Sequence, residues 1–279
     1  MRIALAQIVS TEDRSRNLER VLGAMDKAKA QGAEVVAFAE VVLDRFFPQF
    51  RCSEATIDAK TLAEPIPGPT TERLMAKARD LELVVVFNLY EIDDEGRTFD
   101  SSPVIDADGT LLGVCRMIHI TDYEAFHEQD YYHPGDKGAP VFATRAGKIG
   151  VAICYDRHYP EYMRALALGG ADLVVIPQAG ALGEWPEGLF EAEVRTAAFQ
   201  NGYFVALCNR VGVEDKLTFA GESFISDPDG RVLVRGKRLE EDLVVADLDF
   251  AKCDASAGRR LFLRDRRPEL YPDWVARDR

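Results

Sequence analysis

Short apolar runs alternate with amphipathic segments along the chain. Runs rich in Ala, Val, Ile and Leu predict strands, at residues 2–8, 33–40, 83–93, 148–155, 171–178 and 203–211. Between them, apolar side chains that recur every three or four positions predict helices, at residues 17–31, within 65–82, from about residue 160, and at 189–201. The second helix is expected to begin at Thr70 or Thr71, because Thr is a favoured N-cap residue.

Two hairpins and one long loop interrupt this alternation. The tetrapeptide D-A-D-G joins two strand-like halves of residues 98–120, and residues 219–250 are also hairpin-like. Residues 121–140 are rich in Tyr, His, Gly and Pro and form a connection of a length that is often functional. The whole pattern predicts an α/β fold with a mixed sheet, in a single domain that spans residues 1–279.

The charge and the cysteines narrow the class of partner. The chain has 47 acidic against 34 basic residues, and a net charge of −13 disfavours nucleic acid and anionic lipid. A strand is expected almost at residue 1, where a signal peptide would need a longer apolar region, and no apolar run approaches the length of a membrane span. The five cysteines are widely spaced, which favours reduced thiols in the cytoplasm and no metal or other cofactor.

Cys154 is the first candidate for chemistry. It lies at the end of the apolar run at 148–155 and precedes a helix, although a lone cysteine is more often a small core residue. At a strand-to-helix turn, nearby N–H groups are expected to lower the pKa of a thiol. A cysteine nucleophile needs a base, and Glu40, at the end of another predicted strand, can serve if burial raises its pKa. No G-x-S-x-G motif points to a serine nucleophile.

Five segments in order give the chain a resemblance to a known family. They read "VVAFAE", "GVAICYDRHYPE", "ADLVVIPQAGA", "FAGESFISDPDGRVL" and "RRPELY", and they resemble segments of the nitrilase or carbon–nitrogen hydrolase superfamily over almost the whole length. The resemblance implies an α/β/β/α sandwich whose subunits pair into a four-layer αββα-αββα homodimer or a higher oligomer. It also implies that the tail, from about 252 to 279, packs on the partner subunit.

The resemblance assigns roles to four positions. Glu40 matches the general base and Cys154 the nucleophile, which attacks a carbon–nitrogen substrate to form a thioester. Glu128 lies six residues before Pro134 and matches a second glutamate, which positions the substrate nitrogen or assists proton transfer. The backbone N–H of Tyr155, directly after the nucleophile, is expected to donate to the oxyanion.

Met117 departs from the family pattern. In "CRMIHITD" it occupies the position of a catalytic lysine that stabilises the oxyanion. Loss of one such donor typically costs ~2.7–4 kcal/mol, and a methionine has no hydrogen to donate. Three explanations stay open: another cation (Arg116, His119 or His133) substitutes; the enzyme is slow or has altered chemistry; or the position marks an engineered change or a non-catalytic relative that serves as a binding protein.

The substrate-binding residues are predicted from the segment after the nucleophile. "CYDRHYPE" resembles that of N-carbamoyl-amino-acid amidohydrolases, which implies that Arg157 binds a substrate carboxylate; it could equally pair with Asp156 or Glu161. Trp185, with the tyrosines of the 123–132 loop, is expected to wall the pocket or to serve as packing. The predicted reaction is hydrolysis of a small linear amide or N-carbamoyl compound, with a nitrile as the alternative.

Overall fold

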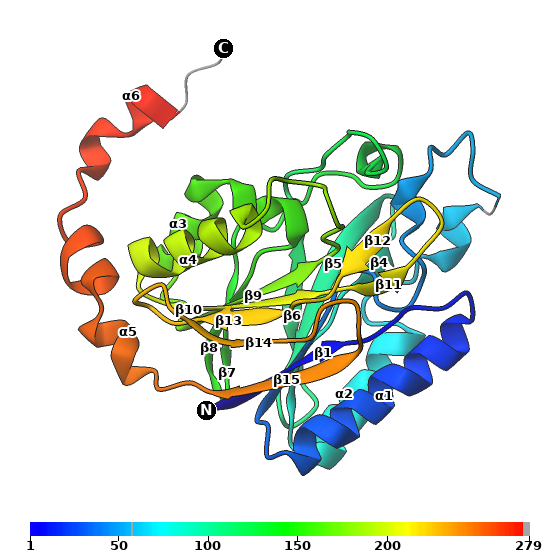
Figure 1. Ribbon diagram of the computed structural model, residues 1–279, viewed down its shortest axis with the longest axis horizontal. Coiled ribbons are helices and arrows are strands. Elements are labelled where there is room, and N and C mark those ends of the chain that lie inside the picture. The colour runs from blue at the N-terminus through cyan, green and yellow to red at the C-terminus, as the bar shows by residue number, and fades with distance from the viewer. Residues whose placement is uncertain (57, 276–279) are drawn as a thin grey trace.

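Two sheets lie face to face in the computed structural model, which describes residues 1–56 and 58–275 (Figure 1). The first sheet has the order β15-β1-β2-β3-β5-β4, with β6 paired to β5. Its strands are β1 (Arg2–Gln7), β2 (Val35–Phe38), β3 (Val84–Val86), β4 (Leu89–Ile92), β5 (Thr98–Ile105), β6 (Leu111–Arg116) and β15 (Asp242–Asp247). Parallel pairs join β1 to β2 and β2 to β3, and the remaining pairs are antiparallel.

The second sheet has the order β14-β13-β10-β9-β8-β7, with parallel pairs at its centre. Its strands are β7 (Val141–Thr144), β8 (Gly147–Val151), β9 (Leu173–Gln178), β10 (Phe204–Asn209), β13 (Phe224–Ser226) and β14 (Val232–Arg235). A separate small ribbon pairs β11 (Val211–Val213) with β12 (Thr218–Ala220). Both large sheets are therefore mixed, as the sequence predicts.

One helical layer covers the outer face of each sheet (Figure 1). The helices α1 (Arg14–Ala30) and α2 (Pro69–Leu81) pack on the first sheet, and α3 (Pro160–Leu168) and α4 (Leu189–Asn201) pack on the second. A third apolar cluster fills the space between the sheets and includes Met117 and Cys154. The predicted α/β/β/α sandwich is confirmed, and the pairing of two subunits stays a prediction.

Two predicted helix starts are wrong in detail, and one predicted strand is interrupted. The first helix begins at Arg14, because the side chain of Asp13 accepts a hydrogen bond from the backbone N–H of Arg16 and caps it. The N-cap of α2 is Gly68, whose N–H donates to the Thr71 hydroxyl, so neither Thr70 nor Thr71 caps this helix. The predicted strand at 83–93 is interrupted at residues 87–88, and its two parts, β3 and β4, pair in one register along the same edge of β5.

The C-terminal segment first packs on its own chain. Within α5 (Ala251–Ala255), Cys253 is buried, and the π-helical turn Gly258–Phe262 lies against α4. The chain then runs around the outside of α3 to α6 (Pro272–Val275) (Figure 1). Packing of the tail on a partner stays a prediction, and residues 276–279 of that prediction lie outside the described residues. Among the described residues, no helix is long and apolar enough to cross a membrane.

Candidate active site

Three side chains from distant parts of the chain meet between the sheets. Glu40 lies two residues after β2, Glu128 begins the 3-10 turn Glu128–Asp130 in the long loop, and Cys154 begins the 3-10 turn Cys154–His158 after β8. Their carboxylate and thiol atoms all lie within 4.8 Å of one another. All three residues are buried. The structure thus brings together the three residues that the sequence analysis assigned to catalysis.

The backbone at Cys154 is held in an unusual conformation. Its φ is +43°, in the left-handed region that residues with a side chain rarely adopt, and such strain is typical of functional positions. The Nε2 atom of Gln178 donates to the Cys154 sulfur at 3.3 Å. Arg157 in turn donates from Nη1 to the Gln178 Oε1 atom and to the Cys154 carbonyl oxygen, both at 2.8 Å. Gln178, which the sequence analysis missed, therefore fixes the position of the sulfur.

The predicted lowering of the thiol pKa is wrong. Burial, followed by the charges of Glu40 and Glu128, raises the pKa of Cys154 well above its usual value. The helix α3 begins only at Pro160, so its N-terminal N–H groups do not adjoin the sulfur. The resting thiol therefore keeps its proton, and a neighbouring base must remove it when substrate is present.

Glu40 has the environment of such a base. Neither of its carboxylate oxygens has a hydrogen-bond partner. Burial, together with the charges of Asp100 and Glu128, raises the pKa of Glu40 well above its usual value. Burial likewise raises the pKa of Glu128. A carboxylate with a raised pKa is a stronger base than one in water, which suits proton transfer from a thiol.

Asp100 is a third buried carboxyl, and sequence reasoning missed it. It lies on β5, and burial raises its pKa to about 7. Asn88 donates from Nδ2 to one Asp100 oxygen at 2.6 Å, and its Oδ1 accepts from the backbone N–H of Val41 at 2.7 Å. Asn88 lies in the break between β3 and β4, so this break links the loop after Glu40 to the strand of Asp100.

Met117 is buried beside this cluster, and the predicted substitute cations are bound elsewhere. Arg116 is next to it on the chain, but side chains alternate along a strand, and Arg116 pairs with Glu91 and Asp136 on the other face. The Nδ1 atom of His119 lies 2.7 Å from Asp156 Oδ1. His133 is exposed, and its Nδ1 lies 3.3 Å from a backbone carbonyl oxygen. None of these three side chains therefore brings a positive charge to the cluster of Glu40, Glu128 and Cys154.

Arg157 is buried with Glu193 as its ion-pair partner. The distance between its Nε and Glu193 Oε2 is 3.2 Å, so neither Asp156 nor Glu161 is the partner. Its guanidinium also lies over the Phe190 ring, 4.5 Å from the centroid. The Nη2 atom is buried without a hydrogen-bond partner. Binding of a substrate carboxylate by Arg157 stays a prediction.

Aromatic side chains and one acid lie near Cys154. Trp185 packs against the rings of Tyr123 and His158, and it shares a cavity of about 560 Å³ with Gln178. Tyr123 and Trp185 both donate to Glu184 Oε1, at 2.6 and 2.9 Å. Tyr155, directly after the nucleophile, stacks edge-on against His158 at 5.0 Å. Glu184 adds negative charge near Cys154.

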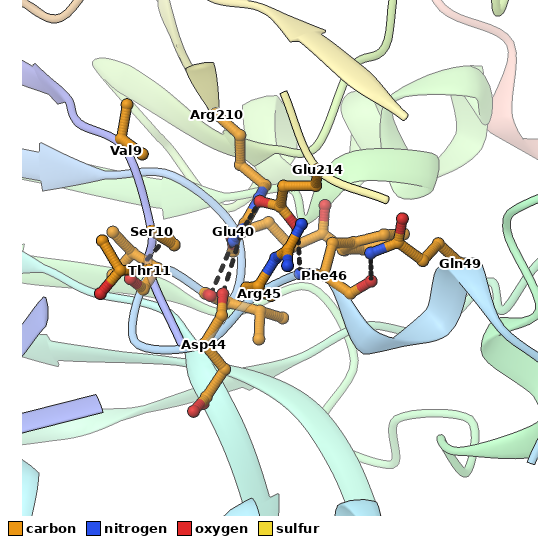
Figure 2. A network of polar contacts seen from close by, with 12 residues as sticks. Val9, Ser10, Thr11, Glu40, Asp44, Arg45, Phe46, Gln49, Arg210 and Glu214 are labelled. Atoms are coloured by element: carbon orange, nitrogen blue, oxygen red, sulfur yellow. Dashed lines mark hydrogen bonds and ion pairs between the residues drawn. The ribbon is translucent and has the colours of Figure 1, made fainter. Parts of the chain in front are cut away.

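Arg210 holds the loop that follows Glu40 (Figure 2). Its Nη1 donates to the carbonyl oxygens of Glu40 and Val41, at 2.8 and 2.7 Å, and its Nη2 donates to that of Asp44 at 2.9 Å. Glu214 pairs with Arg210 and also accepts from the N–H of Phe46. This buried pair fixes the backbone of the predicted base, a role that the sequence analysis missed.

The same cluster has a geometry that could hold a metal ion. Glu40, Glu128 and Cys154 each offer one ligand atom within the 4.8 Å limit. Carboxylate and thiolate ligands of this kind suit a divalent ion such as Zn²⁺. An ion bound there would occupy the sulfur, so it would exclude nucleophilic attack by Cys154.

The fold and the buried Glu–Glu–Cys cluster define a class of enzyme. The carbon–nitrogen hydrolase family matches residues 2–257, and the chain belongs to that family. It is a hydrolase that acts on carbon–nitrogen bonds. It is 33% identical to N-carbamoylputrescine amidase of Solanum lycopersicum, over 96% of this chain and 93% of that protein.

Two solved structures share the whole fold. A carbon–nitrogen hydrolase from Helicobacter pylori G27 has a TM-score of 0.91 and 27% identity, and the match covers 99% of each chain. An amidase variant from Nesterenkonia sp. AN1 has a TM-score of 0.81 and 28% identity, over 98% of this chain and 96% of that one. That variant carries the acetamide moiety of fluoroacetamide on its active-site cysteine.

Proposed function

We propose that the protein hydrolyses a small linear amide or N-carbamoyl compound, with Cys154 as nucleophile and Glu40 as general base. The observation that carries this proposal is the proximity of the Cys154 sulfur to the carboxylates of Glu40 and Glu128, all within 4.8 Å in a buried site. The relatives support the choice of substrate, since they include an N-carbamoylputrescine amidase and an amidase.

The first half of the reaction forms a thioester. Glu40 takes the proton of the Cys154 thiol, and the sulfur attacks the carbonyl carbon. Glu40 then returns this proton to the leaving nitrogen, and ammonia or an amine departs as the carbon–nitrogen bond breaks. The raised pKa of Glu40 suits both steps, because the group must accept and release a proton near neutral pH.

The second half hydrolyses the thioester. Glu40 takes a proton from water, which attacks the thioester carbon and expels the sulfur, and the thiol is restored. Glu128 orients the leaving nitrogen or the attacking water by accepting a hydrogen bond from it. The backbone N–H of Tyr155 is the proposed oxyanion donor, and it does not depend on a lysine at position 117.

A substrate panel with matched variants tests the proposed function. Ammonia release is measured from butyramide, from N-carbamoyl compounds with and without a carboxylate, and from the corresponding nitriles. Cys154→Ala should abolish release, whereas Cys52→Ala, which changes an exposed thiol, should not. A preference for nitriles would favour the alternative enzyme class, and full activity of Cys154→Ala would exclude the mechanism.

A binding protein is the competing function, and Met117 is the observation that favours it. In that case no member of the panel is turned over, and Cys154 reacts with acylating reagents no faster than another buried thiol such as Cys208. The strained backbone at Cys154 favours the enzyme, because a passive core thiol gains nothing from a φ of +43°.

A further inference from the structure

Three buried carboxyl groups of the site have no basic side chain as an ion-pair partner among the described residues. Glu40, Asp100 and Glu128 are each fully buried. Both carboxylate oxygens of Glu40, both of Glu128 and one of Asp100 have no hydrogen-bond partner. The hydroxyl of Tyr132 is also buried without a partner, and the charges of the same three carboxyls act on it. None of the ion pairs found among the described residues involves these three acids.

The other buried acids of the described chain are treated differently. Each of them lies within ion-pair distance of a basic side chain, in the pairs Asp44–Arg14, Glu91–Arg116, Asp156–His119, Glu214–Arg210 and Asp227–Lys252. Because an unpaired buried charge is strongly destabilising, pairing is the rule in this fold. The cluster of Glu40, Asp100 and Glu128 is the exception, and a positively charged ligand can serve as the partner of these three acids.

The electrostatics of the reaction favour a cation at the reacting carbon. Attack of a thiolate on a neutral amide produces an oxyanion, which needs positive charge or several donors nearby. Apart from Arg157, whose Nη1 is held by the oxygens of Cys154 and Gln178, this site presents Met117 and three acids, which repel an oxyanion when ionised. Attack on an amidinium or guanidinium carbon produces a neutral tetrahedral intermediate, so no oxyanion forms.

The ligand geometry also suits such a group better than a metal ion. An amidinium or guanidinium is planar and presents N–H donors in several directions, which matches carboxylates from different elements. Glu40, Asp100 and Glu128 come from three separate segments; Glu40 and Glu128 lie within 4.8 Å of the sulfur, and the charge of Asp100 acts on both of them. A metal ion in the same place would be ligated by the sulfur itself and would block the nucleophile.

We propose that this site prefers a cationic amidino or guanidino compound, bound by Glu40, Asp100 and Glu128, over the neutral amide or N-carbamoyl compound of the proposed function. This inference rests on the proposed roles of Cys154 and Glu40. The sulfur bonds to the central carbon, one C–N bond breaks, and the nitrogen leaves as ammonia with a proton from Glu40. Water then displaces the sulfur, with Glu40 accepting a proton from it. The net reaction converts R–NH–C(NH2)2⁺ and water to R–NH–CO–NH2 and NH4⁺.

Binding of the cation also explains how the thiol becomes reactive. In the resting site, burial and mutual repulsion hold the pKa values of Cys154, Glu40 and Glu128 high. A positive charge among them favours the ionised form of each group. The carboxyls then bind as carboxylates, and the thiolate forms only when its target is in place.

A matched pair of alkylating reagents tests the inference without knowledge of the natural substrate. The probes are 2-chloroacetamide, which is neutral, and 2-chloroacetamidine, which is cationic; both are used in metal-chelated buffer at pH 7.5. The rate of Cys154 alkylation is followed by peptide mass spectrometry, and each rate is divided by the rate of the same reagent with a small thiol. We expect the amidine to be at least ~10-fold faster after this correction.

Variants locate the source of the preference. Glu128→Gln should lose most of it, and Glu124→Gln, which changes an exposed acid in the same loop, should keep it. Asp100→Asn serves the same purpose if Glu128→Gln does not fold. The comparison of the two reagents on the wild-type protein does not require any variant.

The outcomes separate this inference from the proposed function. If chloroacetamide modifies Cys154 as fast as or faster than chloroacetamidine, the cationic substrate is excluded while Cys154 stays a nucleophile. If neither reagent modifies Cys154, the proposed function fails as well. A second measurement compares kcat/KM for a guanidino compound with that of its N-carbamoyl isostere, and a higher value for the N-carbamoyl compound would also overturn the inference.

Discussion

The backbone N–H of Met117 donates to the carbonyl oxygen of Asp100 at 2.9 Å. The two residues are direct neighbours across the β5–β6 pair, because the register matches Ser101 with Arg116 one position away. Their side chains therefore share one face of the first sheet, which looks toward Cys154. An apolar side chain and a buried acid therefore lie side by side where an oxyanion-binding cation is expected.

Met117→Lys should reverse the substrate preference. An ammonium group at this position can pair with the neighbouring carboxylates and stabilise an oxyanion, so hydrolysis of neutral amides should rise by 10-fold to 1,000-fold, on the order of one oxyanion donor. Reactivity toward a cationic reagent should fall, because the two positive charges repel. Steady-state kinetics with butyramide and alkylation with chloroacetamidine measure the two effects.

Met117→Leu is the matched control for this change. It keeps the volume and polarity of the side chain, and both rates should stay within about 3-fold of the wild type. An equal gain from Leu and Lys would show that packing, rather than charge, limits the neutral substrate.

Asp100→Asn should change the pH dependence of stability. Burial raises the pKa of Asp100 to about 7 in the folded protein, above the 3.8 of an unfolded chain. The folded state thus binds the extra proton between these values, and the stability from this group, complete below about pH 4, is lost as the pH rises through 7. The Asn variant should therefore be more stable than the wild type at pH 8 and similar to it at pH 4, as measured by urea unfolding.

Asp247→Asn is the control for this experiment, because its linkage has the opposite sign. The hydrogen bond and charge of Arg2 lower the pKa of this exposed acid. Its contribution is present above the unfolded pKa and lost as the pH falls, so this variant should lose a little stability at pH 8. Equal behaviour of the two variants would contradict the account of Asp100.

Arg210→Met should destabilise the protein and displace Glu40. The change leaves Glu214 buried without its partner and frees the carbonyl oxygens of the loop that Glu40 begins (Figure 2), so we expect a loss of about 3–5 kcal/mol in the free energy of unfolding. Activity should fall through kcat, with a shift in its pH profile, because the base moves relative to the sulfur. Urea titration and pH–rate profiles measure these effects.

An ion pair on the surface serves as the reference for this loss in the free energy of unfolding. Arg195 pairs with Glu191 at a half-exposed position of α4, and Arg195→Met should cost no more than about 1 kcal/mol. A similar small loss for Arg210→Met would mean that the loop is held by other contacts.

The sequence predicted most of the fold because its strands are short, apolar and separated by clear helical periods. It also predicted the positions of Glu40 and Cys154, since both directly follow apolar runs. Asp100 escaped prediction because strand periodicity alone does not tell which face of β5 is buried. That depends on its register with β6 and on the second sheet packed against it.

Long-range contacts account for the remaining differences. Gln178 contacts Cys154, and Arg210 contacts the carbonyl oxygen of Glu40. Both contacts form only after β9 pairs between β8 and β10 and the second sheet packs on the first, which no local pattern encodes. The expected low pKa of Cys154 failed for the same reason. It was inferred from a local helix start, whereas burial and two carboxyls from other segments decide the charge state of the thiol.

The most direct test of the central claim is intact-protein mass spectrometry during turnover. Wild type and Cys154→Ala are mixed with a slowly hydrolysed amide, quenched in acid, and digested to locate any acyl group. The account predicts a thioester adduct on Cys154 that disappears with hydroxylamine, and no adduct or turnover in Cys154→Ala. Turnover at the wild-type rate in Cys154→Ala, or an adduct confined to another cysteine, would contradict it.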